Sequence, residues 1–202
     1  MSEAALFKSQ LGACWQDVHP DIQARFDADP VPGQSIFYDG VMTRIYCTRL
    51  GALLAWVSGF FTTGALCPWR GTDIPALIEV YKRPGSDTIC KKRRYDFPNG
   101  RSYLFESEMC CAPDHTLLEF VGGGFGMTIK VMERDGALFF TDGGYFWGNQ
   151  RWRLRLPALL SPGKVALTHA NLDRDRFTIS IRITHPFFGT LYEQEGTFAR
   201  RR

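Results

Sequence analysis

The sequence lacks the motifs by which most enzymes and metal sites are recognised. Its four histidines and six cysteines form no HExxH motif and no CxxC pair, so the ligand spacings of a zinc site are missing. No GxSxG elbow occurs, and the glycine-rich run at 122–126 has Met127 where a phosphate-binding fingerprint needs glycine. We therefore predict no metal, no cofactor and no catalytic residue. A dyad assembled from distant strands would leave no sequence spacing, so enzymatic activity stays an open question.

The chain also lacks a strong excess of charge. Its net charge is +3, whereas nucleic-acid-binding domains concentrate far more basic charge on one face. Two basic runs occur, at 91–94 and at 200–202. We expect the terminal run to be ordinary solvent-exposed charge. We therefore predict no nucleic-acid partner.

A secretion signal is missing from the N-terminus, because residues 1–4 offer no basic start and no long apolar stretch follows them. This predicts a cytoplasmic location, in which thiols stay reduced. We expect the six cysteines to act as small buried hydrophobic residues rather than as disulfides.

Charge is missing altogether from residues 50–69, a stretch about as long as a membrane span. Seven glycine, serine, threonine and proline residues dilute its hydrophobicity. This favours a helix near 50–61 that is buried or covers a groove. An interfacial helix and a spanning helix remain alternatives, so peripheral contact with a membrane is retained as a second location.

Aromatic residues, in contrast, are abundant, at 14% of the chain with 16 phenylalanines. Apolar residues follow helical spacing at 6–27, where Pro20 breaks or restarts the helix, and then follow period two from 36 to 198. Short turns rich in glycine, proline, asparagine and aspartate separate about ten strands, which forces antiparallel neighbours. We predict a mostly β (α+β) single domain of residues 1–202. Its expected form is a calycin- or lipocalin-like antiparallel barrel, or a strongly curved half-barrel, with an N-terminal helix and one helical insertion.

Polar side chains on inner faces are informative, because burying them costs free energy unless they are paired. In the basic run at 91–94, alternation sends the first and third residues to one face and the second and fourth to the other. We expect Arg94 to meet Glu119 across the interior. The pair is either structural or faces a ligand.

Apolar side chains supply candidate walls for a ligand site. Period two places Tyr103 and Phe105 on one face of strand 101–110, and Ile181 on the apolar face of strand 176–185. Trp152 and Arg153 are neighbours in a further predicted strand, so their side chains point to opposite faces. If Trp152 faces inward, the arginines at 151, 153 and 155 are solvent surface. In the opposite orientation, Arg153 binds a carboxylate or phosphate.

Two further candidate ligand contacts lie next to proline or glycine residues, which constrain or loosen the backbone. His185 precedes Pro186, so its backbone is extended, and a ring nitrogen bonded to a backbone carbonyl is the favoured role. A ligand or haem contact through His185 or His115 is the alternative. Tyr145 lies in the glycine-rich run at 143–148, which either makes room for a flat ligand or marks a bulge.

Several segments resemble a bacterial family, the domain of unknown function 4166. They are Leu11-Gly12-Ala13-Cys14-Trp15 with His19-Pro20 and Arg25-Phe26, Leu156-Pro157-Ala158-Leu159-Leu160, Phe177 to Ile181 with His185-Pro186-Phe187-Phe188-Gly189, and Gly196-Thr197-Phe198. Members are often fused behind a saccharopine-dehydrogenase-like domain. The resemblance implies an accessory role near a small-molecule or lipid-type substrate, with a dehydrogenase-like partner. It implies no catalytic residue.

Three functions follow as hypotheses. The first is a barrel that binds an apolar or acidic amphipathic small molecule, with Arg94 or Arg153 at the acidic head. The second is a solid barrel that uses residues 50–69 to dock a partner or a membrane surface. The third is a haem or redox binder.

Overall fold

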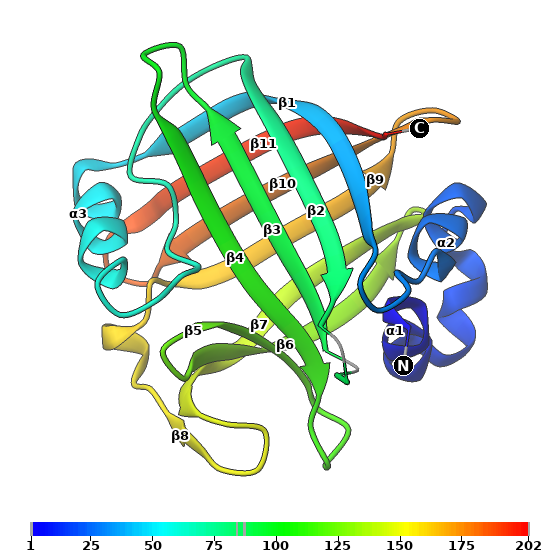
Figure 1. The fold of residues 1–202 in the computed structure, drawn as a ribbon. Coiled ribbons are helices and arrows are strands. Elements are labelled where there is room, and N and C mark those ends of the chain that lie inside the picture. The colour runs from blue at the N-terminus through cyan, green and yellow to red at the C-terminus, as the bar shows by residue number, and fades with distance from the viewer. Residues whose placement is uncertain (1, 84, 87, 202) are drawn as a thin grey trace.

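The computed structural model describes residues 2–83, 85–86 and 88–201, and within them one antiparallel sheet closes into a barrel (Figure 1). The strands are β1 (Ser35–Cys47), β2 (Ile74–Lys82), β3 (Ile89–Asp96), β4 (Ser102–Cys111), β5 (Leu117–Gly122), β6 (Phe125–Arg134), β7 (Ala137–Gly148), β8 (Arg153–Arg155), β9 (Lys164–Asn171), β10 (Arg176–His185) and β11 (Gly189–Arg200). The pairing β6–β7 closes the ring, and β8 is an additional strand that pairs with β7. The predicted antiparallel barrel is confirmed, in its closed form.

Tight turns set the register of the strands. Asp135 and Gly136 both have positive φ, 53° and 78°, and form the two-residue turn between β6 and β7. Such turns match the twist of antiparallel strands, and their backbone suits aspartate and glycine. The local sequence therefore fixes which side chains of β6 and β7 oppose each other.

The predicted N-terminal helix is present and covers one end of the barrel (Figure 1). It consists of α1 (Glu3–Leu11), a 3₁₀ segment at Gly12–Asp17, and α2 (Pro20–Asp27), which restarts at Pro20. Phe7 of α1 and Ile22 of α2 are fully buried and pack with Leu117 and Leu138 of the barrel wall. This apolar contact closes that end.

The second helix region, α3 (Arg49–Ser58), lies at the opposite end and packs on β1 and β11 (Figure 1). Thr48 begins the helix, since its hydroxyl accepts a hydrogen bond from the Gly51 amide at 3.0 Å. A Cβ on Gly51 would lie 2.5 Å from the Leu191 carbonyl oxygen, so the helix backbone sits directly on β11. No helix in the described part of the chain is long and apolar enough to span a membrane.

A loop after α3 completes the barrel wall between β4 and β5. These two strands pair at only four positions, 108–111 with 117–120. Beyond them the Gly64 amide donates to the Val121 carbonyl at 2.8 Å, and the Glu106 amide donates to the Thr63 carbonyl at 3.3 Å. The Tyr192 hydroxyl anchors the same loop through the Cys67 carbonyl at 2.6 Å.

All six cysteines are free thiols, and four of them are buried. The expectation of burial is wrong for Cys14, which is exposed, and Cys111 is only partly buried. Cys14 lies on the outer side of the 3₁₀ segment, where only Trp15 turns toward the core.

Candidate ligand-binding cavity

A cavity of about 530 Å³ occupies the barrel interior between the helices at its two ends. This volume lies within the range of roughly 300–1,000 Å³ that is typical of small-molecule sites. Of the residues that line it, five are exposed on the surface: Leu54, Val57, Phe61, Leu159 and Phe188. All five lie at the α3 end of the barrel, so the mouth of the cavity is there.

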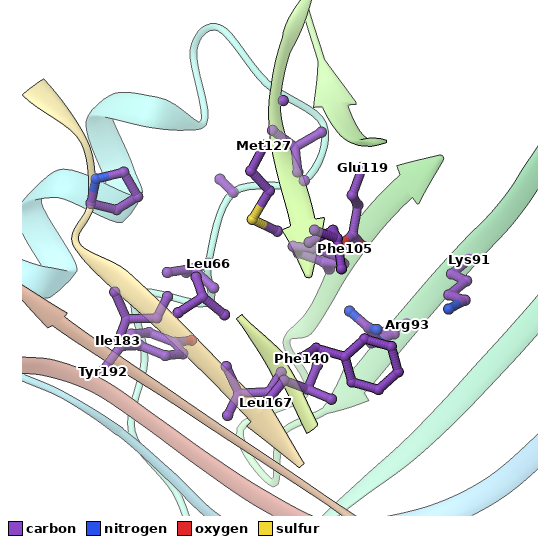
Figure 2. Close-up of a pocket in the computed structure, with 18 of the residues that line it drawn as sticks. Leu66, Lys91, Arg93, Phe105, Glu119, Met127, Phe140, Leu167, Ile183 and Tyr192 are labelled. Carbon is purple, nitrogen blue, oxygen red and sulfur yellow. The ribbon is translucent and has the colours of Figure 1, made fainter. Parts of the chain in front are cut away.

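The cavity wall is mainly aliphatic and aromatic. Ile179, Ile181 and Ile183 line it from β10, because alternate residues of a strand point to the same side. Phe105 of β4 and Leu167 of β9 complete the wall on other sides (Figure 2). Such a surface favours an apolar ligand body through the release of water.

Two groups of polar residues lie toward the closed end. Lys91 of β3 forms an ion pair with Glu3 of α1, and both side chains are largely buried. Arg25 of α2 donates to Nε2 of His169 at 2.9 Å and stacks on Phe177, with 4.1 Å between its guanidinium carbon and the ring centroid. These groups hold the helices of the closed end against the barrel.

Two charged side chains in the cavity have no such partner. Arg93 of β3 lines the wall, and its guanidinium carbon lies 5.0 Å from the Phe105 ring centroid. Glu119 of β5 lines another part of the wall (Figure 2). Within the residues described, neither side chain has an ion pair or a conventional hydrogen bond to another protein group.

Tyr145 of β7 also lines the cavity. Burial raises the pKa of its hydroxyl, and the carboxylates of Asp142 and Glu119 raise it further. Tyr145 therefore stays protonated and offers a neutral hydrogen-bond donor to a cavity ligand.

His185 is buried at the mouth end of β10 and lines the cavity. The sequence predicted that the ring donates a hydrogen bond to a backbone carbonyl. In the structure the ring accepts one instead, because the Phe187 amide donates to Nδ1 at 3.2 Å. The ring stacks on Phe188 with 4.7 Å between centroids. A neutral His185 then carries its proton on Nε2.

Comparison with known proteins identifies the family. Residues 18–198 match the family described as domain of unknown function DUF4166. The chain belongs to the DUF4166 family. This confirms the resemblance seen in the sequence, while the fused dehydrogenase-like domain stays an expectation.

Other comparisons add little to the DUF4166 assignment. No curated protein matches the chain significantly. A solved structure of a thioesterase II candidate from Thermobifida fusca aligns with a TM-score of 0.26 and 11% identity, over 100% of this chain and 87% of that chain. A TM-score this low carries no argument, so the function of this DUF4166 chain has to be argued from its own cavity.

Five of the nine side chains predicted from sequence as ligand contacts line the DUF4166 cavity. They are Phe105, Glu119, Tyr145, Ile181 and His185. They come from β4, β5, β7 and β10, so the closed barrel brings together residues that are far apart in the sequence.

The other four lie elsewhere. Arg94 is exposed and pairs with Asp96 at 3.0 Å instead of meeting Glu119. The Tyr103 hydroxyl donates to the Ala65 and Leu66 carbonyls and anchors the loop after α3.

Arg153 begins β8, Trp152 comes directly before it, and neither side chain lines the cavity. Trp152 is exposed and packs edge-on against Trp147, with 5.7 Å between ring centroids. Arg153 forms an ion pair with Asp114 of the turn between β4 and β5.

Sequence reasoning missed the polar groups that the helices bring to the cavity. Glu3, Arg25 and His169 come together only because α1 and α2 pack on the barrel end. The alternation within 91–94 did separate Lys91 and Arg93 from their neighbours, and it is this pair that faces inward.

Metal coordination has no preformed site in the part of this DUF4166 chain that is described: no three histidine, cysteine, aspartate or glutamate side chains cluster closely enough. Of the two histidines considered for haem, His185 lines the cavity, whereas His115 lies exposed in the turn between β4 and β5.

His169 is expected to make the stability of this DUF4166 domain depend on pH. Burial lowers the pKa of its ring well below the ordinary value of 6.5, and the adjacent Arg25 lowers it further. Below pH 6.5 the unfolded chain binds a proton that the native ring does not, so stability falls as the pH falls. Urea unfolding should show that wild type loses roughly 2 kcal/mol more than His169→Gln between pH 7 and pH 5. The exposed control His115→Asn should behave as wild type, and equal pH dependence in all three proteins would contradict the assignment.

Proposed function

We propose that this DUF4166 domain binds one amphipathic small molecule inside its barrel, with the apolar body along the walls and an acidic head at Arg93. The observation that carries the proposal is a half-buried arginine without an acidic partner among the described residues, in a largely apolar cavity of about 530 Å³. Burying a charge without a partner in such surroundings costs free energy, and a ligand carboxylate or phosphate would supply the missing partner.

The charges in the cavity favour an anion over a neutral ligand. Arg25, Lys91 and Arg93 are cationic, while Glu3 and Glu119 are the acidic residues on the wall. The arginine, lysine and glutamate side chains therefore give the wall an excess of one positive charge. Arg25 and Lys91 are already engaged by His169 and Glu3, which leaves Arg93 for the ligand.

Two further polar groups on the cavity wall suggest a second feature of the ligand. Glu119 accepts hydrogen bonds as a carboxylate, and the neutral hydroxyl of Tyr145 can donate one. A hydroxyl or amide near the acidic head would satisfy both. Ligands of this kind include hydroxylated fatty acids and N-acylated amino acids.

Adjacent arginines allow a matched test, since Arg93 lines the cavity and Arg94 lies on the outer surface. The probe is a dansylated fatty acid whose fluorescence rises in apolar surroundings. Wild type and Arg94→Met should bind it with one-to-one stoichiometry. Arg93→Met should bind at least about tenfold more weakly, because a charge-assisted hydrogen bond is worth roughly 1.5–3 kcal/mol.

Two outcomes would contradict the proposal. One is equal affinity of Arg93→Met and wild type for the probe. The other is a wild-type protein that binds no probe and that carries no co-purified small molecule in native mass spectrometry.

A further inference from the structure

Large apolar side chains surround the mouth of the cavity on the outer surface. We define the mouth face by its exposed members Leu53, Leu54, Trp56, Val57, Phe60, Phe61, Leu159, Phe187 and Phe188. They belong to α3 and the loop after it, to the 3₁₀ turn Ala158–Leu160, and to the turn between β10 and β11, which share one end of the barrel (Figure 1). Trp56 and Phe60 are 60% and 67% exposed and pack edge-on against each other.

The mouth face is continuous with the interior of the barrel. Five of its nine members, those that mark the mouth, also line the cavity. An exposed apolar patch of this kind on a water-facing surface marks an interaction site, because exposing it to water is unfavourable. Here apolar surface extends from the outside of the molecule to the cavity wall.

Two of the three segments that form the mouth face carry no acidic residue. No aspartate or glutamate occurs at 41–72 or at 143–172, the two segments that carry α3 and the turn at 158–160. Arg49, Arg151 and Arg155 lie on these segments and are exposed. The opposite end of the barrel carries both signs, with Asp21 and Arg25 on α2 and an ion pair between Lys8 and Asp27.

We propose that the mouth face docks on a bilayer that contains anionic lipids, and that the ligand passes between bilayer and cavity through the mouth. Exposed tryptophan, phenylalanine and leucine flanked by arginine is the composition of a surface that lies in the membrane interface. The docking follows from the surface itself. The passage of the ligand rests on the proposed function.

A lipid surface fits these observations better than a protein partner does. An apolar ligand body is poorly soluble in water, so direct contact between the bilayer and the cavity mouth shortens its path through water. A protein seated on the same residues would cover the mouth. The basic segments also match the negative surface of an anionic leaflet.

Vesicle flotation tests the docking with variants outside the cavity wall. Trp56 and Phe60 belong to the mouth face but do not line the cavity. Leu172, 51% exposed in the turn between β9 and β10, lies at the far end and provides the control. Wild type and Leu172→Glu should float with vesicles of phosphatidylcholine and phosphatidylserine, and the Trp56→Glu, Phe60→Glu variant should partition at least about tenfold less.

Charge variants test the anionic component. Replacing Arg49, Arg151 or Arg155 by glutamine should lower partitioning by roughly fivefold for each residue, and vesicles of phosphatidylcholine alone should bind less protein. High salt should weaken binding to the anionic vesicles. Equal binding to neutral and anionic vesicles would overturn the role of these arginines.

Probe binding in solution separates the two proposals. The Trp56→Glu, Phe60→Glu variant should keep wild-type affinity for the dansylated fatty acid, which also shows that it folds. A wild type that binds the probe but does not float overturns docking alone. A wild type that floats but binds no probe supports docking and overturns the proposed function. Dimers that the double variant abolishes, without vesicle binding, would assign the mouth face to a protein contact and overturn the proposal.

Discussion

Replacing Ile181 by tryptophan is expected to abolish probe binding while the barrel stays folded. Ile181 lies partly buried on the cavity wall in the middle of β10. The indole would occupy space that the ligand needs, and it would add apolar contacts to the opposite wall. Binding measured with the dansylated fatty acid should fall below detection, with no loss in the free energy of unfolding measured in urea.

The matched control places the same side chain where the core is already full. Ile74 of β2 is buried outside the cavity wall. Ile74→Trp should therefore cost about 1–3 kcal/mol of stability through overpacking. A similar loss for Ile181→Trp would mean that the cavity collapses in solution, and retained probe binding would place the ligand elsewhere.

Replacing Gly51 by valine is expected to be the most destabilising single change in α3. The added side chain would overlap the backbone of β11 at Leu191, and a backbone carbonyl cannot move aside as a flexible side chain can. We expect a loss of about 3 kcal/mol in the free energy of unfolding. Chemical denaturation measures it, and the displaced helix should also change the affinity for the probe.

Leu53→Val provides the control, because it introduces the same β-branched residue into the same helix at an exposed position. Its cost should not exceed the difference in helix propensity, below about 1 kcal/mol. Equal losses in the two variants would show that α3 does not depend on close contact with β11.

The strands were predictable because turn residues mark nearly every strand end. The sequence indicated strands at 101–110 and 176–185, and the structure places β4 and β10 within one residue of these bounds. What the sequence left open was the inward face of the polar strands. Alternation grouped Lys91 with Arg93, but no apolar residue in 91–94 showed which group faces the core.

Strand pairing resolves that choice in the structure. Arg93 opposes Phe105 across β3 and β4, and directly paired residues point to the same side of a sheet. Since Phe105 was already expected on an inner face, the register of this hairpin would have selected Arg93 over Arg94.

The cavity residues that α1 and α2 supply could not be predicted from strand alternation, for another physical reason. Strand alternation says which way a side chain points within a sheet, but it does not say which helix packs on the end of a barrel. Arg25 reaches His169 across 144 residues of sequence, and only tertiary packing places them together. The prediction for Trp152 was wrong for a related reason, because the segment around the short additional strand β8 follows the same alternation as a strand of the ring.

The loop that completes the wall between β4 and β5 has a mechanical consequence. Elsewhere β3 and β4 are joined along eight residue pairs, so widening the ring there means separating a long ladder. At the seam, the Gly64–Val121 and Glu106–Thr63 backbone contacts bridge the gap. Widening the barrel at this seam therefore needs the loop to yield rather than a long ladder to separate, so the size of ligand that the barrel accepts depends partly on this loop and not only on the number of strands.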